Sequence, residues 1–165
     1  MIFFWITILI KLAIMKIFSP SFGHNKNIPS KYTCDGENIN PPLKFKDVPL
    51  EAKSLVLIMD DPDVSKHLRE DGIWDHWLVW NMPSTIKGIA ENSIPNGKVG
   101  LNTSGRNNYV SPCPPDREHR YFFKLYALDI MLDIPVSSAK TVLWAEMQGH
   151  IIDQAELIGL YERRK

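Results

Sequence analysis

Three short apolar runs, each bounded by residues that favour turns, place the strongest constraint on the fold of this chain. Residues 55–59 end at an Asp-Asp-Pro sequence, residues 76–80 end at Asn-Met-Pro, and residues 121–128 form an aromatic run. Their length and their β-branched and aromatic content favour strands, and the first run is expected to be buried on both faces. Twelve prolines, which interrupt helices, argue against an all-helical bundle.

Two later segments complete the predicted elements. Apolar residues recur at helical spacing in residues 137–148, with Ser137 or Ser138 as the N-cap and Gly149 as the stop signal. Residues 155–162 are predicted to form a closing strand, although the start of this segment would also suit a helix. Several strands, one helix and long proline-containing loops predict a mainly β fold, either a β-sandwich or a β-rich α+β domain.

A length of 165 residues fits one domain, which we place at residues 15–165. Residues 1–14 form an apolar prefix that is too short to span a bilayer as a helix and lacks the basic start of a secretory signal. Three explanations remain open: translation starts at Met15, the prefix is an atypical export or anchor segment, or it packs as a helix on the domain. The first predicts a cytoplasmic protein, and the second an exported or membrane-associated one.

Balanced charge and sparse cysteine limit the partners and the compartment. Lys and Arg total 19, as do Asp and Glu, so nucleic acid is not expected as the main partner. A net charge near zero weakens the repulsion between copies, which is compatible with a homodimer. Cys34 and Cys113 are interpreted as free thiols in a reducing compartment, with one long-range disulfide as the alternative.

Charged and aromatic side chains gather at the ends of the predicted strands. Asp61 and Asp63 lie two residues apart around a proline, a spacing that turns both carboxylates to one side of an extended chain. The alternative is an Asp-rich turn that satisfies its own backbone. Trp74 and His76 offer either ligand contacts or a packed core histidine. A stiff proline-rich loop at 111–115 leads toward the third run and would pre-organise a binding site.

Six motifs follow one another along the chain: YTCDGENINPPL (32–43), DDPD (60–63), WDH (74–76), SPCPP (111–115), HRYFFKLYALD (119–129) and MQGHIIDQAELIGLYER (147–163). Together they resemble the phosphatidylethanolamine-binding protein family, also called Raf kinase inhibitor-like proteins, and above all its bacterial YbhB/YbcL type. The likeness covers the chain from about Met15 to its end, which makes Met15 the natural start.

The resemblance implies a large antiparallel sheet packed on a smaller sheet, with peripheral helices. It also implies a non-enzymatic protein without a cofactor, whose small cavity binds an anion such as phosphate or a phospholipid headgroup. Because the family includes kinase and protease inhibitors, a protein partner of unknown identity is implied as well. The ligand-binding residues carried over by motif are Asp61, Asp63, Trp74, His76, Pro112, His119 and Tyr121.

The chemistry of these residues suits a phosphate. Histidine N–H groups, backbone N–H groups and the Tyr121 hydroxyl can donate to it. A neighbouring carboxylate favours charged histidine, so phosphate binding is predicted to weaken as the pH rises through the histidine pKa. The chain departs from the family pattern where Val64-Ser65 replaces Ala-Pro and where Ser111 replaces glycine. Since serine lacks the backbone freedom of glycine, a tighter or shifted rim is expected.

The alternative function is a metal-dependent hydrolase. Asp61, Asp63, His76 and His119 carry oxygen and imidazole ligands that suit Zn²⁺ or Mn²⁺. The sequence contains neither an H-E-x-x-H zinc motif nor a G-x-S-x-G nucleophile elbow, and no metal is expected.

Overall fold

The computed structural model describes residues 14–163. The expectations for the apolar prefix therefore lie outside the described residues, apart from Ile14, which is exposed. Within this range, none of the helices has the length and the apolar character needed to cross a bilayer.

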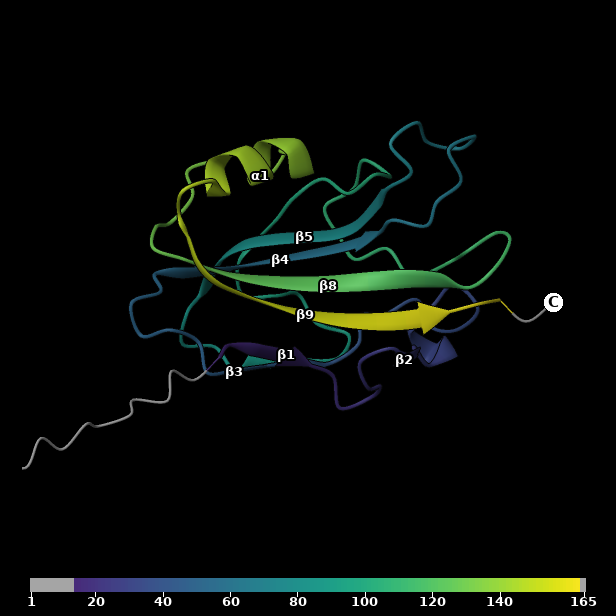
Figure 1. Ribbon diagram of the computed structural model, residues 1–165, viewed down its shortest axis with the longest axis horizontal. Helices are drawn as coiled ribbons and strands as arrows, with labels where there is room; N and C mark the ends of the chain where they lie inside the picture. The colour runs from purple at the N-terminus through teal and green to yellow at the C-terminus, as the bar shows by residue number, and fades with distance from the viewer. Residues whose placement is uncertain (1–13, 164–165) are drawn as a thin grey trace, which may run out of the picture.

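Two sheets and one α-helix form three layers, with the large sheet between the helix and the small sheet (Figure 1). The large sheet has the strand order β2-β9-β8-β4-β5-β7 and is antiparallel except where β2 pairs with β9. The small sheet has the order β1-β3-β6 and is antiparallel. The described elements are β1 (Lys16–Phe18), β2 (Lys26–Asn27), a 3₁₀ helix (Ser30–Tyr32), β3 (Leu43–Lys46), β4 (Ser54–Asp61), β5 (Trp74–Pro83), β6 (Gly88–Ile89), β7 (Lys98–Val99), β8 (His119–Leu128), α1 (Lys140–Met147) and β9 (Ile151–Tyr161). The mainly β fold, with a large sheet against a smaller one, is confirmed.

The three apolar runs form the centre of the large sheet as β4, β5 and β8. Successive side chains of a strand point to opposite faces, and here each face has its own core. Leu55, Leu57 and Met59 pack toward the small sheet, whereas Val56 and Ile58 pack toward α1. Strand β4 is therefore buried along its whole length, as predicted.

The helix and the closing strand are confirmed, with different boundaries. Helix α1 starts after Ala139, which has an extended backbone and provides no side-chain cap, so the predicted caps Ser137 and Ser138 are wrong. The amide of Ser138 instead closes a turn onto the carbonyl of Pro135. Gly149 follows the helix with a φ of 80°, a left-handed conformation that favours glycine and ends the helix as predicted.

The two cysteines form a disulfide, which corrects the preferred interpretation of free thiols. Cys34 and Cys113 are 79 residues apart in sequence, but their Cα atoms lie 5.4 Å apart. The amide of Cys34 also donates to the carbonyl of Pro112 at 3.1 Å, so backbone pairing holds the two segments together. Sequence spacing alone could not reveal this approach, because it follows from the tertiary fold.

Candidate ligand-binding cavity

A small cavity of about 230 Å³ lies at one end of the large sheet. Antiparallel pairing brings the end of β4 beside the starts of β5 and β8, since Asp61 pairs with Trp74 and Asp60 pairs with Phe122. Five of the seven expected site residues line the cavity: Asp61, Trp74, His76, His119 and Tyr121. The fold thus brings together three segments that are distant in sequence.

Asp61 and His119 form a buried pair in the wall of this cavity. Asp61 Oδ2 lies 2.7 Å from His119 Nδ1, and both side chains are almost fully buried. The other oxygen of Asp61 accepts a hydrogen bond from the amide of Asp63 at 2.8 Å. Asp61 therefore orients a histidine and satisfies a local turn at the same time.

Asp116, which sequence reasoning did not single out, contacts the second nitrogen of the same histidine. His119 Nε2 lies 2.9 Å from Asp116 Oδ1. Carboxylates only accept hydrogen bonds, so both ring nitrogens donate and His119 is an imidazolium. The hydrogen bonds from His119 and from the amide of Arg117 lower the pKa of Asp116. One cation therefore lies between two anions.

A β-bulge places His76 in the cavity wall. Met59 pairs with Trp77 while the next residue, Asp60, pairs with Asp75, so His76 is the extra residue of β5. As a result His76 lines the cavity while Trp77, its neighbour in sequence, packs into the core on the same side of the sheet. Such a bulge leaves no clear signal in a single sequence.

His76 is neutral near physiological pH. Its Nδ1 lies 2.7 Å from the carbonyl of Val110, which can only accept, so this nitrogen carries the proton. Burial lowers the pKa of His76 more than the nearby carboxylates of Asp61 and Asp60 raise it. The remaining nitrogen, Nε2, is therefore an acceptor, and His76 is not the charged donor that the sequence led us to expect.

Tyr121 brings an unsatisfied hydroxyl to the same wall. Its side chain is 0% exposed, and the hydroxyl has no hydrogen-bond partner among the described residues. The ring meets that of His76 edge-on, with centroids 5.3 Å apart. Burial raises the pKa of Tyr121, so the hydroxyl keeps its proton and can donate. A buried donor without a partner is rare and indicates a place for a ligand or a water molecule.

Two of the expected site residues lie elsewhere. Asp63 faces Arg120, with Oδ2 2.8 Å from Nε and Oδ1 2.7 Å from Nη2, and these hydrogen bonds lower the pKa of Asp63. Pro112 is buried, and its carbonyl accepts a hydrogen bond from the amide of Cys34. Neither residue lines the cavity, because the chain turns after Pro62 and the extended spacing assumed for the two carboxylates does not continue.

The rest of the cavity wall is mainly apolar, and much of it comes from the proline-rich loop 111–115 that the sequence indicated. It is formed by Val64, Leu68, Val110, Pro114 and Pro115, together with Ser111 and Cys113. The proline motif indicated the loop residues, whereas Leu68 carries no signal beyond its closeness to the acidic turn. Ser111 is nearly buried and does not adopt a left-handed backbone, so its position does not depend on glycine.

The described residues offer no metal site. Within residues 14–163, no group of three or more His, Cys, Asp or Glu side chains is arranged to hold a metal ion. Both nitrogens of His119 donate to carboxylates and so have no lone pair for a metal. Ser111 lines the same cavity as His119, but no hydrogen bond joins the two side chains in this part of the chain.

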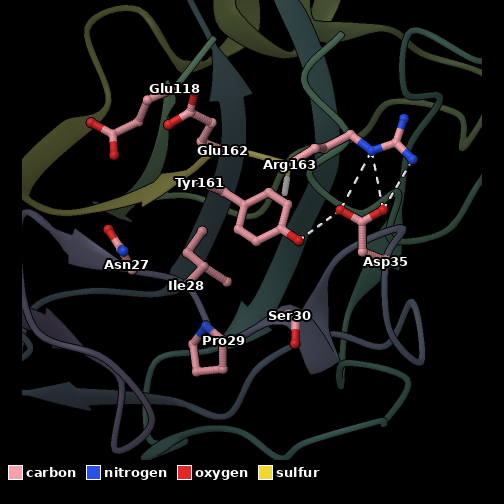
Figure 2. Close-up of a pocket in the computed structure, with 9 residues that line it drawn as sticks. All are labelled: Asn27, Ile28, Pro29, Ser30, Asp35, Glu118, Tyr161, Glu162 and Arg163. Carbon is pink, nitrogen blue, oxygen red and sulfur yellow. Dashed lines mark hydrogen bonds and ion pairs between the residues drawn. The ribbon is translucent and has the colours of Figure 1, made fainter. Parts of the chain in front are cut away.

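A second hollow, of about 680 Å³, is lined mostly by polar side chains (Figure 2). Its central feature is Asp35, which accepts a hydrogen bond from the Tyr161 hydroxyl at 2.8 Å and pairs with Arg163. Asp35 follows Cys34 directly in sequence. This network therefore fixes the turn to which the cavity rim is bound by the disulfide.

Comparison with known proteins identifies the family and agrees with the fold. The family model described as phosphatidylethanolamine-binding protein matches residues 18–162. A UPF0098 protein of Chlamydia pneumoniae is 50% identical over 149 residues, which cover 90% of this chain and 99% of the relative. One of Methanothermobacter thermautotrophicus is 46% identical over 155 residues, with the same coverage.

Solved structures give the same result. The crystal structure of a phosphatidylethanolamine-binding protein homologue from Chlamydia trachomatis has a TM-score of 0.90 and 48% identity, and covers 92% of this chain and 99% of its own. Escherichia coli YbcL shares the fold, with a TM-score of 0.81 at 24% identity over 92% of this chain and all of its own. The chain belongs to the phosphatidylethanolamine-binding protein family.

Proposed function

We propose that this protein is a non-enzymatic binding protein whose cavity holds a small phosphate-containing anion, such as a phospholipid headgroup. The observation that carries this proposal is the buried hydroxyl of Tyr121, which has no hydrogen-bond partner within residues 14–163 and lies in the same wall as the imidazolium of His119. A phosphate oxygen would complete the hydrogen bonding of the hydroxyl.

The charge of Asp61 does not exclude an anion from the cavity. Asp61 would repel a phosphate, but its charge is offset by His119 at 2.7 Å. Apolar residues such as Val64 and Pro114 make the wall less polar than water, and hydrogen bonds to a charged group are stronger in such surroundings. The volume of about 230 Å³ is below that of common drug-sized pockets and suits a headgroup.

Binding by the Tyr121 hydroxyl can be tested by isothermal titration calorimetry with inorganic phosphate and phosphorylethanolamine. Tyr121→Phe removes one hydrogen bond to a charged ligand and should weaken binding about 10-fold or more. Tyr126→Phe is the matched control, because Tyr126 is also buried but lies on the α1 side of the sheet. The proposal fails if the wild type binds neither compound, or if Tyr121→Phe binds as well as the control.

The two titrants distinguish the source of the phosphate. Tighter binding of phosphorylethanolamine than of inorganic phosphate would support a lipid headgroup, and the reverse order would support the free ion. Regulation of a kinase or protease, which the family resemblance implies, would be a further role, and no geometry among residues 14–163 selects it. No nucleophile is hydrogen-bonded to His119 in that range, so no catalytic step is proposed.

The compartment is a separate question. The expected cytoplasmic location rested in part on free thiols, and the Cys34–Cys113 disulfide removes that support, because disulfides persist mainly in oxidising compartments. Trapping thiols with a mass-tagged maleimide in the native cells tests this directly. Untagged protein would place the mature chain in an oxidising compartment, whereas addition of two tags would support the cytoplasm.

A further inference from the structure

We propose that Asp116 is a built-in competitor of the anionic ligand: its carboxylate occupies the outward nitrogen of His119, and the ligand must displace it. The inference rests on the proposed function and names a residue that sets anion affinity. It arises from the arrangement of one histidine between two unlike carboxylates.

The two carboxylates on His119 differ in burial and support. Asp61 belongs to β4, is 3% exposed and is held by the amide of Asp63. Asp116 belongs to the loop before β8, and its side chain is 51% exposed. Half-exposed ion pairs contribute little to stability, so the contact between Asp116 and His119 can open while the contact with Asp61 stays closed.

The contact at Nε2 has the geometry of a ligand contact. A carboxylate oxygen and a phosphate oxygen both accept charge-assisted hydrogen bonds from an imidazolium at about 2.7–2.9 Å. Asp116 Oδ1 lies 2.9 Å from His119 Nε2, at the distance that an oxygen of the ligand would take. Two anionic oxygens cannot share one N–H without repulsion, so Asp116 and the ligand exclude each other at this atom.

Competition within the protein lowers the affinity of the site for anions. Every anion must first open the pair formed by Asp116 and His119, so the apparent affinity for phosphate and for acetate is reduced by the same factor. After displacement, the half-exposed carboxylate of Asp116 remains near His119 as a negative group. Removing this carboxylate should tighten the binding of both anions.

The test compares four proteins by isothermal titration with inorganic phosphate and with acetate at one mildly acidic pH. Asp116→Ala frees Nε2 and should bind phosphate about 3- to 5-fold more tightly than the wild type. Asp116→Asn keeps a weaker acceptor and should give a smaller gain. Glu118→Gln is the control, because Glu118 is exposed, lies two residues from Asp116, and loses the same charge, while its side chain makes no ion pair with His119 among the described residues.

The outcomes separate this inference from the proposed function. If the wild type binds phosphate and Asp116→Ala binds it equally or more weakly, the competitor role is wrong and the binding function stands. A gain in Glu118→Gln equal to that in Asp116→Asn would also overturn it, since net charge alone would then explain the effect. If none of the proteins binds phosphate, both ideas fail. Binding by Asp116→Ala but not by the wild type would support both.

Discussion

Asp60 and Asp61 are neighbours in β4 and both are almost fully buried, but they point to opposite faces of the large sheet. On the α1 side, Asp60 Oδ2 lies 2.9 Å from Nζ of Lys124 and 3.2 Å from Nζ of Lys140. On the side of the small sheet, Asp61 pairs with His119 in the cavity wall. Two aspartates with nearly the same burial thus have different partners.

The difference shows which buried acidic residue can serve a ligand. Lysine keeps its charge near neutral pH, so Asp60, Asp75, Lys124 and Lys140 form a set of ion pairs that stabilises the fold. His119 has a second nitrogen beyond its contact with Asp61, and this nitrogen meets only the half-exposed carboxylate of Asp116. Open space, together with a donor held by an exposed partner, distinguishes the cavity side, whereas burial alone does not.

The largest expected effect comes from the disulfide, which braces only the cavity side. Replacing both cysteines by serine (Cys34→Ser with Cys113→Ser) removes a cross-link between residues 79 apart. Chain-entropy arguments predict that the free energy of unfolding falls by about 4 kcal/mol, measured by urea denaturation. Because Cys113 lines the cavity, phosphate affinity should fall as well, which calorimetry can measure.

Chemical reduction provides the control for this variant. Wild-type protein in dithiothreitol should match the double variant in both measurements, and the reductant should leave the double variant unchanged. A double variant with the urea midpoint and phosphate affinity of the oxidised wild type would show that the cross-link braces neither the fold nor the cavity.

Sequence reasoning found the central strands because their physical signal is local. Runs such as 55–59 and 121–128 are short, apolar and bounded by turns. This local pattern indicates a buried strand independently of the rest of the sequence. The N-cap of α1 was missed because the amide of Ser138 closes a turn with Pro135, a choice that the serine itself does not reveal.

The site was predicted in part for the same reason. His119 and Tyr121 alternate along β8 and so reach one face together, which their spacing already indicates. Asp63 was misplaced because its partner Arg120 comes from another strand. The pairing of Cys34 with Cys113 depends on distances through space, and Asp116 gains its contact only through the path of a loop. Neither a distance through space nor the path of a loop can be read from a single sequence.

A matched pair of variants tests the comparison between the two carboxylates directly. Asp60→Asn and Asp61→Asn each remove a charge from a buried or partly buried ion pair. Each should lower the free energy of unfolding by about 2 kcal/mol, which is less than for a fully enclosed pair, because the lysines beside Asp60 are partly exposed and His119 keeps its contact with the half-exposed Asp116. Phosphate affinity should fall about 10-fold in Asp61→Asn only, because the imidazolium loses its buried counter-ion. Urea denaturation and calorimetry measure the two quantities.

The control for this pair is Lys98→Met, which removes an exposed lysine that makes no ion pair among the described residues. It should change neither stability nor affinity. Equal losses of phosphate affinity in Asp60→Asn and Asp61→Asn would contradict the separation of the two faces, because the lysine cluster would then also contribute to binding.

The smallest expected effect is a pH dependence that only the cavity side should show. Burial lowers the pKa of His76 in the folded protein, while the unfolded chain keeps a value near 6.5. Protons therefore bind the unfolded state more readily, so stability is full above about pH 6.5 and falls below it by up to about 1 kcal/mol for the first pH unit. His76→Asn, whose amide can still donate to the Val110 carbonyl, should lose this component in urea denaturation at several pH values. The control is His67→Asn, at an exposed histidine of the loop after β4, which should keep this pH-dependent component of stability. Identical pH profiles for the wild type and His76→Asn would show that the ring of His76 is not held neutral by burial.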